Sequence, residues 1–191
     1  CFKSKKIPVL IMTDAIDQFW LPMVGSFKEK KFTSITQGQI NLDDLDEKNK
    51  DKKKDDKNEK EKKDKEYVDL VAQLKVVLGD QVKDIRLSSK LTDSPVCLVA
   101  DEGDMDIAME QLMAQRDTNY KGAPRILEIN GDHSLIKNMK SLLSKKENND
   151  LVSDAGTLLF EQARLMEGKM PADPAQFSKI MNQFLLKAIP N

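Results

Sequence analysis

The sequence predicts an α+β fold: a small three-stranded sheet with helices, and a C-terminal helical hairpin. Three observations lead to this prediction. Short strand-like runs occur at residues 82–87, 96–100 and 125–129, helical periodicity fills the intervals around them, and two amphipathic segments close the chain. The 191 residues suffice for one to two compact units.

The first 42 residues read as the α/β tail of a preceding domain. Residues 7–12 form an apolar run before Thr13 and Asp14, the pattern of a buried strand followed by a helix N-cap. A helix over 15–27 and a strand over 32–36 would complete the tail. Because the chain begins with Cys1 and opens directly into this pattern, we expect it to be a piece of a longer protein.

Residues 43–66 are dominated by charge, with ten Lys and eleven Asp or Glu among 24 residues. We expect a solvated linker in the first half and the exposed start of a helix in the second. That helix gains an apolar face from Tyr67 to Leu78, ends at Gly79 and opens a domain assigned to 67–191. The charges nearly cancel, to −1 over the whole chain, so neither nucleic acid nor a membrane is an expected partner.

Further helices are predicted at 104–115 and 134–146. The first places methionine and leucine on one stripe, formed by Met105, Met109, Leu112 and Met113. A methionine stripe is more often part of a core. Methionine is also flexible and polarizable, and therefore suits a surface that accepts varied partners. The pattern alone leaves both interpretations open.

The terminal hairpin consists of helices predicted at 151–167 and 174–188. Gly168 suits the end of the first helix, Asp173 the N-cap of the second, and Pro174 its first position. The apolar faces are too wide for one small domain to cover. We therefore predict that two hairpins from two chains form a dimeric four-helix bundle. The predicted dimerisation residues are Leu151, Ala155, Leu158, Leu159, Gln162, Leu165, Met166, Phe177, Ile180, Met181, Phe184 and Leu185.

The sequence shows no catalytic, cofactor-binding or metal-binding constellation. The one histidine, His133, stands just before a predicted helix, where a turn or cap role is expected. Neither a glycine-rich phosphate loop nor metal-ligand spacing occurs. Cys1 and Cys97 suggest no disulfide framework, and no apolar run approaches the roughly 20 residues that span a bilayer. A cytoplasmic location is expected.

Four segments resemble motifs of the heat-shock protein 90 chaperones, and of their bacterial members in particular. They read IPVLIMTDAID (7–17), RLSSKLTDSP (86–95), LEINGDH (127–133) and LLFEQA (158–163), in the family's order and spacing. Gly131 stands where the family usually has proline. The resemblance covers essentially the whole chain and assigns it to the end of the middle domain plus the C-terminal dimerisation domain.

The resemblance implies a dimeric, ATP-dependent chaperone whose partners are a second copy and unfolded client proteins. It places ATP and magnesium in the full-length protein, outside this chain, which should not hydrolyse ATP alone. It also favours exposure of the methionine stripe. The client-binding residues that it implies are Gln18, Phe19, Trp20, Met105, Met109, Leu112 and Met113.

Two other functions remain as alternatives. Where the family has Glu-Trp, this chain has Gln18 and Phe19, and its tryptophan is the next residue, Trp20. The main alternative is a purely structural homodimerisation scaffold without direct client contact, in which the methionine stripe packs into the protein's own core. An enzyme would need an active site that the sequence does not show.

Overall fold

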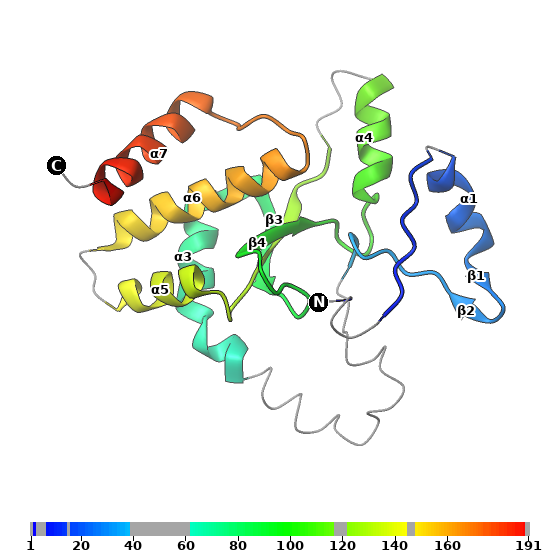
Figure 1. Cartoon of the computed structure of the whole chain (residues 1–191), viewed down its shortest axis with the longest axis horizontal. Coiled ribbons are helices and arrows are strands. Elements are labelled where there is room, and N and C mark those ends of the chain that lie inside the picture. Colours follow the sequence, from blue (N-terminus) through cyan, green and yellow to red (C-terminus); the bar gives the residue numbers. More distant parts are fainter. Residues whose placement is uncertain are drawn as a thin grey trace.

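A computed structural model of the chain describes residue 2 and residues 7–14, 16–38, 62–116, 122–144 and 148–189. Its elements confirm an α+β fold (Figure 1). In chain order they are α1 (Asp17–Val24), β1 (Ser26–Phe27), β2 (Lys30–Lys31), α3 (Val68–Leu78), the 3₁₀ helix η2 (Gly79–Gln81), β3 (Val82–Leu87), β4 (Val96–Val99), α4 (Ile107–Arg116), β5 (Arg125–Ile129), α5 (Ser134–Leu143), α6 (Asn149–Met166) and α7 (Pro174–Ala188).

The main sheet has three strands in the order β3-β5-β4. The central strand β5 pairs parallel with β3 and antiparallel with β4. All five residues of β5 are buried, as befits a strand covered on both faces. The strands predicted at 82–87 and 125–129 are confirmed. The third ends at Val99 because Ala100 pairs with Gln37 in an isolated parallel bridge.

Helices α3, α5 and α6 pack against one another, and α3 and α6 also pack against this sheet. Helix α7 lies along α6 at the edge of the molecule (Figure 1). Helix α3 contributes Leu70, Leu74 and Leu78, which are one helical turn apart and fully buried. Helices α3 and α6 approach closely at Gly156, where a Cβ would lie 2.3 Å from Leu74 Cδ2. The buried core is formed by Tyr67, Leu70, Leu74, Leu78, Val82, Ile85, Val96, Leu98, Leu127, Ile129, Ile136, Met139, Val152, Leu159, Phe160 and Ala163.

The helix boundaries differ from the predictions by a few residues. Residues 62–66 are helical, as predicted for the end of the charged run, and α3 ends before Gly79. Helix α4 begins at Ile107 rather than 104, because the Asp106 side chain accepts from the Ala108 amide at 3.0 Å. The linker prediction for 43–61 lies outside the described residues.

Two strands predicted in the N-terminal tail are wrong. Residues 7–12 form no strand in the described chain, and Leu10 and Ile11 are 69% and 83% exposed. A parallel strand needs neighbours to pair with, and no described segment pairs with residues 7–12.

The strand predicted at 32–36 is replaced by a hairpin of β1 and β2 just before it. Lys28 and Glu29 between them have positive φ, which a type I′ turn requires. Lys-Glu is not a usual sequence for that turn. Helix α1 is also shorter than the predicted 15–27, and Gly25 with φ +64° ends it.

The segment 34–38, here called the strap, fastens this N-terminal part to the rest. The Gly38 amide donates to the Ala100 carbonyl at 2.8 Å, and the Ala100 amide donates to the Thr36 carbonyl at 3.0 Å. The Arg86 Nη2 donates to the Gly38 carbonyl at 2.8 Å. Hydrogen bonds thus hold the strap beside β4 and across to β3.

Candidate functional site

The first candidate surface is the hairpin of α6 and α7, whose connection is fixed by two backbone motifs. Gly168 follows α6 with φ +78°, and its amide donates to the Leu165 carbonyl while Lys169 donates to Arg164. This pair of bonds is a Schellman motif. The Asp173 Oδ1 accepts from the Gln176 amide at 2.9 Å, and Pro174 is the first residue of α7. The predicted caps are confirmed.

A buried carboxylate further fixes the connection. Glu161 of α6 is 4% exposed, and both its oxygens accept from the Ala172 amide, at 3.1 and 3.2 Å. The Arg164 Nε lies 3.7 Å from it. Sequence reasoning missed this contact, because a glutamate in an amphipathic helix usually faces water.

The structure divides the predicted dimerisation residues into covered and uncovered ones. Leu159 and Ile180 are 5% and 2% exposed, covered by the chain itself. Half-buried members are Leu151, Ala155, Leu158, Phe177 and Phe184, and exposed members are Gln162, Leu165, Met166, Met181 and Leu185. The sequence prediction omitted Met170, Leu186 and Ile189, which are 71%, 77% and 68% exposed. Ile189 could have been found by continuing the i+4 spacing of Met181 and Leu185. Leu186 lies about 180° from Phe177 around α7, outside the predicted apolar face, so helical spacing gave no signal for it.

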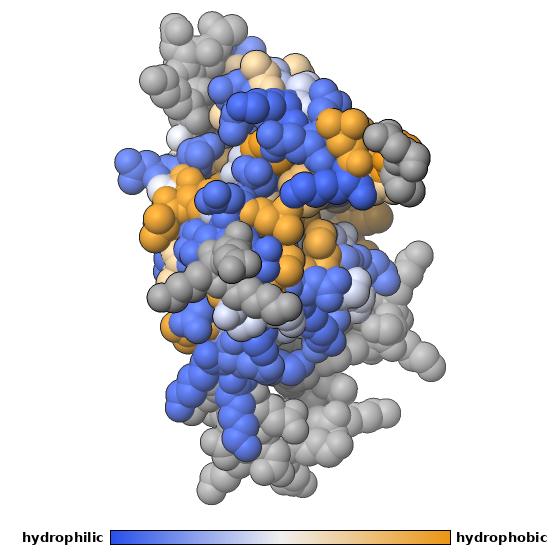
Figure 2. Space-filling view, turned by 90° about the vertical axis from the view of Figure 1, so that its left-hand side faces the viewer, coloured by the Kyte–Doolittle hydropathy of each residue, from blue (hydrophilic) through white to orange (hydrophobic). Residues whose placement is uncertain are grey.

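Apolar side chains therefore remain open at both ends of the hairpin. Ile180 is the one buried residue of α7, which the structure describes in full. Figure 2 looks at the end of the molecule that carries α7 and shows apolar groups there, interleaved with charged residues. Helix α7 therefore has little apolar contact with its own chain, and its exposed leucines, Leu185 and Leu186, are available to contact another molecule.

The second candidate surface is α4. Met105, just before it, is 38% exposed, and Met109, Leu112 and Met113 are half-buried. No apolar residue of α4, a helix described throughout, is buried. The stripe is therefore neither core nor fully open.

The third candidate surface is α1, with the predicted residues Gln18, Phe19 and Trp20. Trp20 is half-buried: its Nε1 donates to Asp17 Oδ1 at 2.8 Å, and its ring meets Phe32 edge-on at 6.4 Å. Phe19 is 40% exposed, and Gln18 is half-buried. Adjacent helical residues point about 100° apart, so one aromatic ring packs while the other faces outward.

A buried carboxylate holds the sheet and the strap together. Glu128 of β5 is 2% exposed and accepts from Arg86 Nε and Nη2, at 3.2 and 2.9 Å, and from Ser88 Oγ, at 2.9 Å. The Lys90 Nζ lies 3.5 Å from Glu128 and donates to the Ile35 carbonyl in the strap. Sequence patterns carry no signal for this network, since its members come from three separate segments: the strap, residues 86–90 and β5.

Cys97 borders this network with its Sγ 3.8 Å from Glu128 Oε2. Burial, together with the negative charge of Glu128, raises the pKa of the Cys97 thiol to about 11. The thiol is therefore neutral near pH 7, and the geometry supplies no activated nucleophile here.

Within the described ranges, no group of histidine, cysteine and carboxylate side chains could hold a metal ion. His133 caps α5, because its Nδ1 accepts from the Leu135 amide at 3.1 Å. None of the helices in this part of the chain is long and apolar enough to cross a membrane.

Comparison with known proteins gives one consistent result. The family profile described as "Hsp90 protein" matches residues 1–190. A "Chaperone protein HtpG" from Roseobacter denitrificans is 40% identical over 190 residues, 98% of this chain and 30% of the relative. Proteins of the same name from Wolbachia pipientis and Coxiella burnetii are 37% and 38% identical, over 97% of this chain and 29% and 28% of their own lengths. The chain thus spans less than a third of the curated relatives it matches. It belongs to the Hsp90 protein family.

Proposed function

We propose that this chain is the C-terminal dimerisation and client-binding region of an ATP-dependent, HtpG-like chaperone that assists protein folding in the cytoplasm. The observation that carries the proposal is the exposed apolar end of α7, in a chain of this family. ATP binding and hydrolysis with magnesium belong, on this proposal, to parts of the protein outside this chain.

Dimerisation follows from the exposed hairpin. Burying one exposed leucine contributes about 1.5–3 kcal/mol, and Leu185 and Leu186 are 48% and 77% exposed. Two copies related by a twofold axis would present the same hairpin to each other and form a four-helix bundle. The paired hairpins would then raise the effective concentration of any domains linked to them.

The test of dimerisation is the variant Leu185→Glu/Leu186→Glu. A charge buried in an apolar interface without a partner is costly, so the dimer dissociation constant should rise by at least about 100-fold. Ile180 stays in place, so α7 keeps its attachment to α6. The matched control is Gln176→Glu/Ser178→Glu, which adds the same charge at exposed polar positions near the start of α7, away from Leu185 and Leu186. Sedimentation velocity showing equal masses for the two variants would contradict the proposed interface.

Client binding is proposed for the α4 stripe together with Phe19 of α1. Flexible methionine side chains adapt to different apolar partners, which a chaperone requires. The scaffold alternative has one observation in its favour: Met109, Leu112 and Met113 are already half covered by the chain itself.

The variant Leu112→Ser/Met113→Ser separates the two functions. Under the client proposal it weakens binding of a permanently unfolded polypeptide, leaving the dimer mass and melting temperature unchanged. Under the scaffold alternative it lowers the melting temperature, because cavities in packed apolar regions destabilise. The matched control is Ala114→Ser/Gln115→Ser on the exposed side of the same helix.

A further inference from the structure

Helix α4 is attached to the molecule through charge rather than through an apolar face. Its one buried residue is Glu110, 4% exposed, in a helix that the structure describes completely. A surface helix ordinarily buries an apolar stripe instead. Glu110 is therefore a main attachment of α4. A second attachment lies at the start of the helix, where the Asp106 carboxylate accepts from Ser34 Oγ at 2.6 Å and from Thr36 Oγ1 at 2.9 Å.

Glu110 meets the start of β5 and the residues that lead into it. Arg125 Nη2 donates to Glu110 Oε2 at 2.5 Å, and both side chains are almost fully buried. The Ala123 amide donates to the other oxygen, Oε1, at 3.0 Å. Arg125 Nη1 also donates to the Met105 carbonyl at 3.3 Å, just before α4 begins. One guanidinium thus holds α4 at two points.

Gly122 leaves room for this arrangement. Its φ is +69°, and a Cβ there would lie 2.8 Å from Glu110 Oε2. A side chain at this position would both strain the backbone and press on the carboxylate. The close approach of the chain to Glu110 therefore needs glycine.

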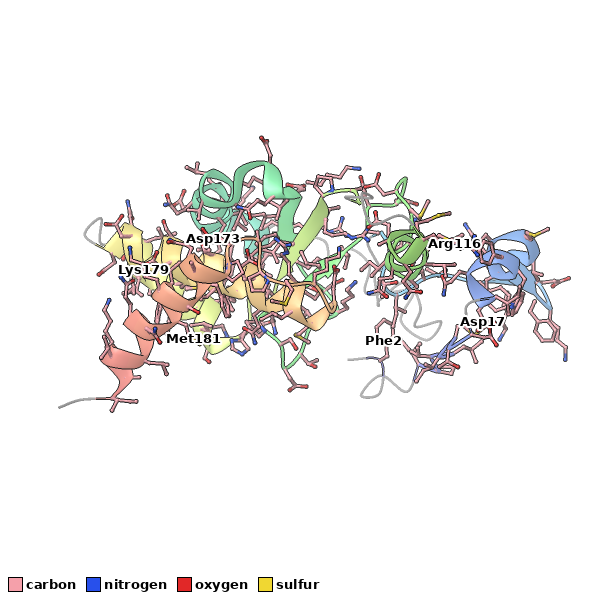
Figure 3. All side chains as sticks on the ribbon, turned by 90° about the horizontal axis from the view of Figure 1, so that it is seen from above. Phe2, Asp17, Arg116, Asp173, Lys179 and Met181 are labelled. Atoms are coloured by element: carbon pink, nitrogen blue, oxygen red, sulfur yellow. The ribbon has the colours of Figure 1, made fainter. Side chains whose placement is uncertain are left out.

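The attachment fixes the rotation of α4 about its axis. Successive helical residues turn by about 100°, which places Gln111 on one flank of Glu110. Met113, Met109 and then Leu112 lie at increasing angles from Glu110 on the other flank. The Gln111 flank faces α6, because Gln111 Nε2 donates to the Glu167 carbonyl at 3.1 Å. The methionine flank is turned to the opposite side. Figures 1 and 3 show α1 on that opposite side of α4, with Arg116 marking the end of α4 and Asp17 lying on α1.

We infer that Glu110 and Arg125 are positioning residues, which hold α4 so that its methionine flank is a preformed contact surface facing the side of α1. The inference rests on the proposed client-binding function. A helix already held in one orientation loses less conformational entropy when an apolar client segment binds to it. The affinity for that segment is therefore higher, although no contact is added. Neither residue touches the bound segment itself.

The test removes both charges at once, in the full 191-residue chain, with Glu110→Met/Arg125→Met. Replacing the pair together leaves no buried charge without a partner. Amide hydrogen exchange in 107–116 should become about 10-fold faster, while the amides of β4 and α3 keep their protection. The affinity for reduced, carboxymethylated α-lactalbumin, a permanently unfolded polypeptide, should fall about 5-fold.

Two further variants act on the same contacts more gently. Arg125→Lys keeps the charge, but one ammonium cannot replace a planar fork that reaches both Glu110 and the Met105 carbonyl, so both effects should appear in part. Gly122→Ala disturbs the carboxylate without altering either charge and should act in the same direction. The matched control is Lys63→Met/Asp132→Met, which removes an exposed ion pair of 3.0 Å and should change neither measurement.

Each outcome gives a distinct answer. Unchanged exchange in 107–116 would overturn the inference, and so would faster exchange of every element, because the pair would then serve general stability. Selectively faster exchange with weaker binding supports it. Selectively faster exchange with unchanged affinity would uphold the positioning of α4 but overturn its part in client binding, leaving dimerisation untouched.

Discussion

At the scale of single residues, burial changes the acidity of the Cys97 thiol. Because burial and Glu128 raise the pKa of Cys97 from 9.0 to about 11, the thiol binds its proton more tightly in the folded chain than in the unfolded one. The stabilisation that results is complete below pH 9 and is lost as the pH rises through 11. Replacing Cys97 with Ala should remove this part of the pH dependence.

The reactivity of Cys97 follows from the same shift. At pH 8 the thiolate fraction of Cys97 should be about 100-fold lower than in the unfolded chain, so alkylation by iodoacetamide should slow by about that factor. Mass spectrometry of the peptide that contains Cys97, with and without urea, measures this ratio. Equal rates in the two conditions would show that the thiol is not shielded.

Gly156 is a second residue whose surroundings exclude any larger side chain. A methyl group there meets Leu74 at 2.3 Å, so Gly156→Ala should lower the free energy of unfolding by about 1–3 kcal/mol through overpacking. Gly103→Ala is the matched control, since nothing lies within 4 Å of a Cβ at that position. Urea unfolding curves that coincide for the two variants would rule out close packing of α3 and α6 there.

At the scale of elements, α7 depends on its cap because it buries only Ile180 in its own chain. Asp173→Ala removes the side-chain acceptor of the Gln176 amide and should cost about 1 kcal/mol of helix stability. Hydrogen exchange in the first turn of α7 should increase, whereas exchange in α3 should not. The conservative variant Asp173→Asn should retain most of the protection.

Elements with a local signal were predictable, and elements formed by distant pairing were not. The spacing of α7 and its Asp173-Pro174 start are contained within the 16 residues 173–188, and the predicted range 174–188 matches the structure. The strap pairs with Ala100, more than 60 positions away along the chain. A strand was predicted over part of it, at 32–36, but nothing in that segment indicated its partner. Residues 7–12 show the converse error: their apolar pattern predicted a strand that the structure does not contain. An apolar segment becomes a strand only when other strands are present to pair with it.

The candidate site follows the same division. Periodicity identified the stripe of α4 and the apolar faces of the hairpin. The buried glutamates that hold these elements, Glu110 and Glu161, were missed, because their partners are Arg125 and a backbone amide that helical spacing does not reveal. Nor could spacing show that Leu159 and Ile180 are covered within one chain.

At the scale of the whole molecule, the proposed client surfaces and the proposed dimer surface lie at opposite ends. Figure 1 shows α1 and α4 on one side of the sheet and α7 on the other. A second chain docked on the free end of α7 would leave α1 and α4 uncovered. Dimerisation and client binding should therefore be separable by mutation. The Leu185→Glu/Leu186→Glu variant should lose only the dimer, and the Leu112→Ser/Met113→Ser variant should lose only client affinity.

The most direct measurement is the mass of the 191-residue chain by light scattering over a concentration series, beside a version that ends at Lys169. The account predicts twice the 21.6 kDa of one chain for the first and a single chain for the second. A single-chain mass at every concentration for the complete sequence would contradict it, since the hairpin would then serve only its own domain.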